Sequence, residues 1–382
     1  MKFSDIIGQQ HIKNHLMYSA RNKRIPHAQL FIAPEGVGAL PMAIAYAQYI
    51  ICQNEADDNE GGNASCNLKF ESTGQHPDLH FSFPIYTNKT EKKNSSDDYY
   101  TSWYDFIKNE PYGSYFDWLR KIEVKNQQLL INVKEAENIS KKLSLKSYEG
   151  GYKVMIIWMA EKMNIEAANK LLKILEEPTD KTLFLLIAED EKAILPTILS
   201  RCQVLHFNRL SDHDIAEALQ TKFAVDEHKA KAIAKLAQGN FNKALKELNK
   251  SDEELPFDQW FVDWVRAAFR ANKDAKVVTN LVSWSEDLSS IGRENQKLFL
   301  EHCLEIFRQA LLWNYQAKAL VYYKSTVENF HLEKFAPFIN DKNIFEIYDE
   351  INEAIYHIER NANPKILFTD LSIKLTRLIH KK

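Results

Sequence analysis

Short apolar segments alternate with amphipathic helical segments through the first half of the chain, and this order constrains the fold more than any other feature. The strand-like segments are HAQLFIAPEG, DLHFSFPIY, YKVMIIWMA, KTLFLLIAED and QVLHFNRL. The runs with apolar residues at helical spacing include ALPMAIAYAQYIIC, INVKEAENISKKLSLKSYEGG and NIEAANKLLKILEEP. Such an alternation predicts an α/β fold, in which helices cover both faces of a parallel sheet.

Strand-like segments stop after about Leu210, and the rest of the chain has the pattern of helices alone. Short helical runs follow directly, and one of them is ended by Gly239. Longer helical runs fill the remainder, among them QKLFLEHCLEIFRQALLWNY and PKILFTDLSIKLTRLI. We therefore predict an α/β domain over residues 1–208, a small helical domain over residues 209–250 and a helical C-terminal domain over residues 251–382.

Composition narrows the class of protein. The chain of 382 residues has a formal net charge of −3, so contact with nucleic acid requires a local basic patch rather than an overall basic field. Its four cysteines are too few for a disulfide framework and suit a reducing compartment. The start, MKFSDIIGQQ, lacks the pattern of a signal peptide, and no charge-free apolar run approaches the roughly 20 residues that span a bilayer. We expect a soluble cytoplasmic protein without membrane contact.

The segment FIAPEGVGALPM resembles a phosphate-binding loop of the pattern G-x-x-x-x-G-K-[ST]. Gly38 takes the place of the second glycine, and Gly36 also suits the turn of such a loop. Ala33 replaces the first glycine, Ala39 the lysine and Leu40 the hydroxyl that binds magnesium. Loss of the lysine removes a charge-assisted hydrogen bond of about 1.5–3 kcal/mol. The loop is either the remains of a nucleotide site or an ordinary strand-to-helix turn.

The second half of such a site is also altered. In P-loop ATPases an apolar strand ends in an aspartate that holds magnesium, often followed by a glutamate that acts on water. In YKVMIIWMAEKMN the corresponding positions are Trp158 and Met159, and Glu161 comes too late in the sequence. Two independent losses in one site argue against ATP hydrolysis by this chain.

Arg201 is the third candidate functional residue. It lies in LPTILSRCQVLHF, between the end of a predicted helix and a predicted strand, with Ser200 and Cys202 on either side. An arginine at such a place is either a solvated surface charge or an arginine finger, which reaches a phosphate bound by a neighbouring subunit. The local sequence leaves both interpretations open.

A family resemblance joins these features. The segments HAQLFIAPEGVG, LSLKSYEGGYKVMII, AANKLLKILEEP, LPTILSRC and GNFNKAL occur in this order. Together they resemble the delta-prime family of bacterial DNA polymerase III clamp-loader subunits, within the AAA+ superfamily, over residues 1–250. The resemblance implies an AAA+ domain of P-loop type with a degenerate loop, a small helical lid and a helical C-terminal oligomerisation collar.

The resemblance also implies a function. The chain would bind no nucleotide cofactor and have no ATPase activity of its own, and Arg201 would act as a finger in trans on the ATP of a motor subunit. As a component of the DNA polymerase III holoenzyme, a DNA-directed DNA polymerase, it would help to load the sliding clamp onto primer-template DNA. The implied partners are gamma/tau-type motor subunits and a delta-type clamp-opening subunit. Two alternatives stay open: an active ATPase motor that binds nucleotide without the lysine, and a pure interaction scaffold.

Cysteine usage departs from many clamp-loader relatives, which carry a four-cysteine zinc module. Here that region offers only Cys52 and Cys66, which His76 and His80 would have to complete. Structural zinc ligands usually come in pairs two to four residues apart, and these cysteines lack such partners. We therefore expect no metal, two buried cysteines and ordinary loop histidines.

Two further stretches have no assigned role. Thr87–Asp98 is polar and charged and is expected to be an exposed insertion. The lysine-bearing segments RKIEVKNQ and SKKLSLKSYEGGYK are either solvated helix faces or contacts for the phosphate backbone of DNA.

Overall fold

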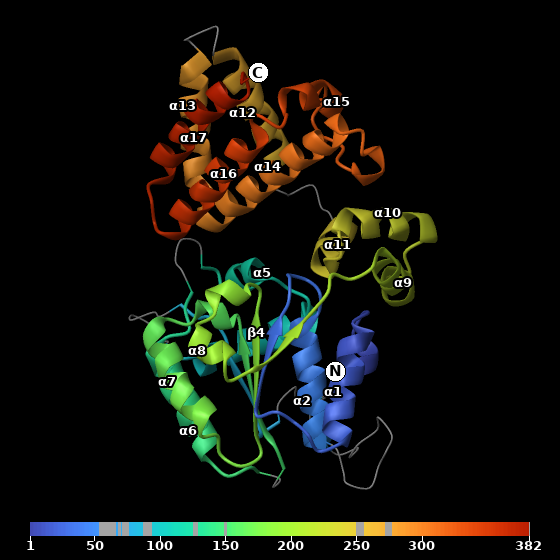
Figure 1. Ribbon diagram of the computed structural model, residues 1–382, viewed down its shortest axis with the longest axis vertical. Coiled ribbons are helices and arrows are strands. Elements are labelled where there is room, and N and C mark those ends of the chain that lie inside the picture. Colours follow the sequence, from blue (N-terminus) through green and yellow to red (C-terminus); the bar gives the residue numbers. More distant parts are fainter. Residues whose placement is uncertain are drawn as a thin grey trace. The chain divides into compact units, whose positions relative to one another are not determined.

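Figure 1 shows the computed structural model, which describes residues 1–52, 66–67, 70, 76–86, 94–124, 129–148, 151–249, 256–271 and 277–381. The chain divides into two compact units, Met1–Lys250 and Ser251–Lys382. Each unit has a hydrophobic core of its own. The predicted domain boundary near residue 208 lies inside the first unit, where it stays a prediction.

A five-stranded sheet in the order β2-β3-β4-β1-β5 forms the centre of the first unit. Its strands are β1 (Ala28–Ile32), β2 (Leu79–Ser82), β3 (Lys153–Trp158), β4 (Thr182–Ala188) and β5 (Gln203–His206). Every pairing is parallel, and Leu30 of β1 lies opposite Leu186 of β4 and Val204 of β5. The arrangement confirms the predicted α/β class with a parallel sheet.

Helices cover both faces of this sheet (Figure 1). The helices of the first unit before the last strand are α1 (Gln10–Arg21), α2 (Ala39–Cys52), α4 (Tyr100–Asn109), α5 (Tyr115–Lys121), α6 (Val133–Ser144), α7 (Ile165–Glu176) and α8 (Pro196–Leu199). Short 3-10 turns are η1 (Phe3–Asp5), η2 (Ser96–Tyr99), η3 (Ala160–Lys162) and η4 (Glu191–Ala193). Successive strand residues point to opposite faces, so Leu185 packs in the core with α1 and α2, and Leu186 packs in the core with α6 and α7.

An aromatic cluster fixes α4 and α5 on the α2 face of the sheet. Trp103 and Trp118 are completely buried. The ring of Trp103 stacks on Phe83 with centroids 4.1 Å apart and contacts Trp158 at 5.2 Å. The aromatic segment over residues 99–119 thus packs onto the body of the domain.

The polar stretch Thr87–Asp98 is only partly an exposed insertion. Residues 87–93 lie outside the described residues, but Ser96 is buried. Its N–H and hydroxyl donate to the buried carboxylate of Glu135 at 2.9 and 2.5 Å. The expectation of exposure is therefore wrong for Ser96, because the Glu135 carboxylate needs hydrogen-bond donors inside the protein, whereas Asp97 and Asp98 are exposed as expected.

The first unit ends with α9 (Asp212–Phe223), α10 (Glu227–Ala237) and α11 (Phe241–Leu248). Each has a polar N-cap, since the side chains of Ser211, Asp226 and Asn240 accept hydrogen bonds from backbone N–H groups in the first turn. Ile215, Leu219 and other apolar side chains of these helices form a separate small core. We call α9–α11 the lid.

The second unit consists of helices. They are α12 (Phe257–Ala271), α13 (Val278–Ser290), α14 (Arg293–Asn314), α15 (Leu332–Phe335), α16 (Ile344–Glu359) and α17 (Pro364–Leu378), with the turns η6 (Lys318–Leu320) and η7 (Ala336–Phe338). Trp264 stacks on Trp284 at 5.0 Å and donates through its indole N–H to Ser372 at 3.0 Å. Among the helices of the described residues, none is both long and apolar enough to cross a bilayer.

Candidate functional site

The loop between β1 and α2 keeps the backbone of a phosphate-binding loop. Gly36 and Gly38 have φ angles of 72° and 93°, a conformation that residues with a Cβ rarely adopt. The following helix starts at Ala39. Ala39 and Leu40 are both buried, so apolar side chains fill the positions from which a P-loop presents its lysine and its hydroxyl.

The ring of Tyr112 lies directly on this loop. A Cβ added at Gly38 would come within 2.8 Å of a ring carbon of Tyr112. The Tyr112 hydroxyl accepts a hydrogen bond from the N–H of Ile7 at 2.9 Å, and its ring meets Phe241 edge-on at 5.0 Å. Burial raises the pKa of Tyr112 to about 12. Tyr112 is thus a neutral, anchored cover over the second glycine of the loop.

The lid contacts the same loop from its own side. The N–H of Phe241 donates to the carbonyl oxygen of Gly36 at 3.0 Å. The amide nitrogen of Asn240 donates to Glu35 at 3.1 Å. A Cβ at Gly36 would fall only 1.8 Å from the side-chain oxygen of Asn240. The loop therefore has its glycines where the lid and Tyr112 approach its backbone.

Only a small hollow remains beside the loop. Its lining consists of Ala33, Pro34, Glu35, Gly36, Gly38, Ala39, Leu40, Pro41, Pro111, Tyr112, Gly113, Trp158, Met159, Ile187 and Glu189. The cavity volume is about 30 Å³, whereas small-molecule sites typically enclose about 300–1,000 Å³.

The chemistry of this lining also disfavours a nucleotide. Trp158 and Met159 stand at the end of β3, where carboxylates would hold magnesium. The charged side chains of the lining are Glu35 and Glu189, and carboxylates repel the phosphates of ATP. The residues present in the hollow do not fit a nucleoside triphosphate with its magnesium ion.

Asp117 joins the aromatic segment to the lid. Its side chain is buried, and it accepts hydrogen bonds from the amide of Asn242 at 2.7 Å and from Lys246 at 2.9 Å. Ser114 donates to the same carboxylate through its N–H and its hydroxyl. Burial alone would raise the pKa of Asp117, but Lys246 and these hydrogen bonds lower it overall. Asp117 is therefore an ionised carboxylate that holds α11 against the turn before α5.

Arg201 lies apart from this hollow, at the surface between α8 and β5. Its Nη1 donates to the carbonyl oxygen of Thr197 at 2.9 Å and to the hydroxyl of Ser200 at 3.3 Å. Its Nη2 donates to Glu176 at 2.5 Å, and its side chain is 35% exposed. The neighbouring Cys202 packs toward the α7 core, and burial raises its pKa to about 11. Of the motif Ser-Arg-Cys, Ser200 is exposed and Arg201 is partly exposed, whereas Cys202 packs inward.

Known proteins share the segment that carries these residues. The family model described as "DNA polymerase III, delta subunit" matches residues 8–211. This match decides the family. The chain belongs to the delta-subunit family of DNA polymerase III.

Curated relatives of this family confirm the resemblance to the delta-prime subunit. The DNA polymerase III subunit delta′ of Bacillus subtilis is 30% identical over 62% of this chain and 58% of its own length. The delta′ subunit of Haemophilus influenzae is 30% identical over 52% of this chain and 48% of its own. The subunit tau of B. subtilis is 26% identical over 100% of this chain and 62% of its own. The chain thus spans about half to three-fifths of the length of these relatives.

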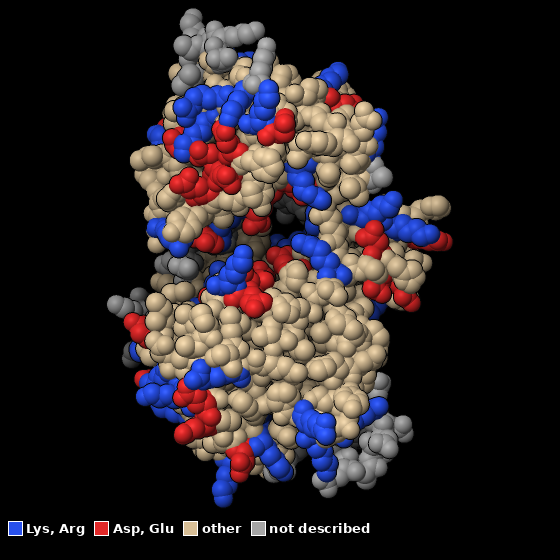
Figure 2. All heavy atoms as spheres, in the orientation of Figure 1, with Lys and Arg blue, Asp and Glu red and all other residues tan. Residues whose placement is uncertain are grey.

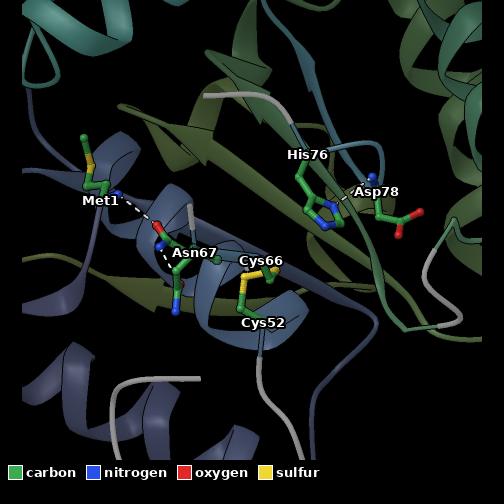
Figure 3. Close-up of a disulfide and its surroundings, with 7 residues drawn as sticks. Met1, Cys52, Cys66, Asn67, His76 and Asp78 are labelled. Atoms are coloured by element: carbon green, nitrogen blue, oxygen red, sulfur yellow. Dashed lines mark hydrogen bonds between the residues drawn. A yellow bond between two sulfur atoms is a disulfide. The ribbon is translucent and has the colours of Figure 1, made fainter. Parts of the chain in front are cut away.

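Two of the four cysteines of this delta-prime family member form a pair. Cys52 at the end of α2 and Cys66 are joined by a disulfide with Cα atoms 5.5 Å apart (Figure 3). Both cysteines are buried, as expected, but the disulfide between them was not predicted. The sequence gives no sign of this pairing, because a separation of 14 residues between two cysteines matches no recognisable spacing pattern.

The histidines that a zinc site would need have other contacts. His76 accepts a hydrogen bond from the N–H of Asp78 at 3.1 Å (Figure 3), and its ring stacks on Phe70. Burial lowers the pKa of His80 to about 4. In the part of the chain that the structure describes, no group of three or more His, Cys, Asp or Glu side chains is placed to hold a metal ion.

Sequence motifs located the loop and Arg201 but missed the residues that cover the loop. Tyr112 and Asp117 lie in an aromatic segment without a recognisable motif. Their partners Ile7 and Asn242 are 105 and 125 residues away along the chain. One segment with a recognisable pattern, GNFNKAL, does carry two residues that contact the loop, Asn240 and Phe241.

Proposed function

We propose that this chain is a clamp-loader subunit that does not hydrolyse ATP and that supplies Arg201 in trans to the ATP site of a neighbouring motor subunit. The observation that carries the proposal is the contrast between its two candidate sites. The hollow beside the P-loop is small, acidic and covered by Tyr112. Arg201, by comparison, keeps its guanidinium at the surface, where another subunit can reach it.

The geometry around Arg201 suits a finger. Phosphoryl transfer spreads negative charge over the oxygens of the transferred group, and a guanidinium placed there stabilises that charge. Thr197 and Ser200 bind Nη1 and limit the freedom of the side chain. No acceptor among the described residues takes the Nε–H and the second Nη2–H of the five donors. These two groups are available for a phosphate of the neighbour.

The proposed partners are those of a clamp loader in the cytoplasm: gamma/tau-type motor subunits, a delta-type clamp-opening subunit, the sliding clamp and primer-template DNA. Similarity to subunits named delta′ and tau supports membership in the complex. Blue and red side chains are interspersed on the face shown in Figure 2, which favours local rather than extended contacts with DNA phosphates.

The C-terminal helices are proposed to form the oligomerisation collar. Phe345 and Tyr348 on α16 are 72% and 54% exposed, and Ile366 and Ile373 on α17 are 69% and 51% exposed. Exposed apolar side chains concentrated on two helices are typical of interaction surfaces. Assembly with other subunits would bury these side chains in an interface.

An active motor is the alternative function, because the tau relative aligns over the whole of this chain. Equilibrium titration of the full-length chain with Mg-ATP discriminates between the two. We expect no saturable binding up to about 1 mM ATP and no magnesium-dependent turnover, since the residues of the hollow do not fit the nucleotide. Micromolar binding with turnover would contradict the proposal. The pure-scaffold alternative is tested by Arg201→Ala in the assembled loader. A fall in the ATPase rate would exclude a pure scaffold, and an unchanged rate would support it.

A further inference from the structure

Arg201 is engaged on its own subunit through Glu176. The Nη2 atom of Arg201 donates to Oε1 of Glu176 at 2.5 Å. The two side chains are 35% and 49% exposed, so water and a partner can both reach the pair. The two residues are 25 positions apart and come from different elements, the end of α7 and the turn after α8.

The end of α7 attracts Arg201 for a second reason. Glu176 is the last residue of α7, and Glu177 follows it. The C-terminus of a helix carries a partial negative charge, to which these carboxylates add. The guanidinium of Arg201 offsets this charge, and its own positive charge is partly neutralised in return.

We propose that Glu176 is a positioning residue that holds Arg201 on its own subunit, so that the neighbour's triphosphate must compete with Glu176 for the guanidinium. This inference rests on the proposed function of Arg201 as a finger in trans. Glu176 competes with the phosphate in two ways. It occupies an Nη2–H of the guanidinium, and it places a negative charge close to where the phosphate would bind. Glu176 thereby restrains the ATPase of the neighbouring motor subunit.

Orientation of Arg201 does not depend on Glu176 alone. Thr197 and Ser200 hold the Nη1 side of the guanidinium. A glutamine at position 176 would keep an oxygen of the same reach but lose the charge. The substitution Glu176→Gln therefore removes the competition while it preserves the packing and most of the orientation of the arginine.

The test uses the loader reconstituted from full-length subunits, with clamp and primed DNA. We expect Glu176→Gln to raise kcat/KM for ATP about two- to fivefold, the range of an exposed ion pair, mainly through a lower KM. Glu177→Gln is the matched control, because Glu177 is an exposed neighbour at the same helix end and, among the described residues, only Glu176 of the two accepts a hydrogen bond from Arg201; its effect on kcat/KM should be clearly smaller than that of Glu176→Gln. In an Arg201→Ala background the effect of Glu176→Gln should disappear. Size exclusion and thermal melting check assembly and folding.

The outcomes separate the two proposals. An unchanged or lower kcat/KM with Glu176→Gln would overturn the positioning role while leaving the finger in place. An equal rise in the Arg201→Ala background would overturn it as well, because Glu176 would then act without the arginine. If Arg201→Ala alone leaves the ATPase unchanged, the proposed function itself fails, and this inference fails with it.

Discussion

Gly38 and Tyr112 form the tightest contact between the loop after β1 and the aromatic segment. The φ angle of 93° at Gly38 is that of a tight glycine turn. In a nucleotide-binding loop, such glycines let the backbone approach phosphates. Here the space next to Gly38 holds the ring of Tyr112 instead. The glycine thus still serves close approach, but the group that approaches is a side chain of the same protein.

Substitution of Gly38 by alanine tests this packing. The new Cβ would need a positive φ and would come within 2.8 Å of the Tyr112 ring. We expect Gly38→Ala to lower the free energy of unfolding by about 1–3 kcal/mol, measured by urea denaturation. Gly151→Ala is the matched control, because a Cβ there would meet nothing within 4 Å. Equal stability of the two variants would show that Tyr112 does not lie on the loop.

The role of a single residue could be interpreted from the sequence only where a motif fixed the position of that residue. Ala39 and Leu40 occupy two positions of a known loop pattern, so the sequence alone shows that the lysine and the hydroxyl of that pattern are missing. The same holds for Trp158 and Met159 at the end of β3. Tyr112 had no such pattern, and its contact with Gly38 depends on its packing in the small core with Ile7 and the lid helices.

Among the elements, the attachment of α11 to the α/β core is the one with the clearest physical cause. Asp117 presents a buried carboxylate to Asn242 and Lys246 of α11. The N–H of Phe241 adds a backbone hydrogen bond to Gly36. In this arrangement α11 is held against the α/β core by contacts within the chain.

Replacement of Asp117 by asparagine should loosen this attachment. The variant Asp117→Asn loses the ion pair with Lys246, and we expect the free energy of unfolding at pH 7 to fall by about 1–3 kcal/mol. The pKa of Asp117 in the folded protein is lowered below its usual value. Its contribution is therefore fully present above the unfolded pKa of about 3.9 and is lost as the pH falls through the folded pKa.

The measurement is chemical denaturation of the wild type and the variant at a series of pH values from 7 downward. The difference between them should be constant near neutrality and shrink below about pH 4. Asp105→Asn provides a control, since Asp105 on α4 is an ion-paired but exposed carboxylate, and exposed pairs contribute little. If the difference between Asp117→Asn and wild type grew in acid, the carboxylate would not have a lowered pKa in the folded protein.

Elements could be predicted well wherever the apolar pattern was continuous. The strands β3 and β4 are buried along their whole length, and an unbroken apolar run is what a central parallel strand requires. The disulfide between Cys52 and Cys66 could not be predicted, because pairing depends on the distance between the two residues in the folded chain. The burial of Ser96 was missed for a similar reason, since its partner Glu135 lies 39 residues away along the chain.

The molecule as a whole has two units, each with a hydrophobic core of its own. The first unit contains the five-stranded parallel sheet, and Tyr112 and two acidic side chains line the small hollow beside the loop after β1. The second unit has an independent helical core and exposed apolar residues on α16 and α17. We propose that the chain offers the clamp loader Arg201 and the surfaces that place it next to a motor subunit.

The measurement that tests this claim most directly is the clamp- and DNA-stimulated ATPase rate of the reconstituted loader with wild-type chain and with Arg201→Ala. Arg24→Ala serves as the control, because Arg24 is an exposed arginine of the same unit. Size exclusion verifies assembly of all three. We predict a fall of at least about tenfold, or 1.4 kcal/mol of barrier, for Arg201→Ala alone. An unchanged rate in an intact assembly would contradict a finger acting in trans.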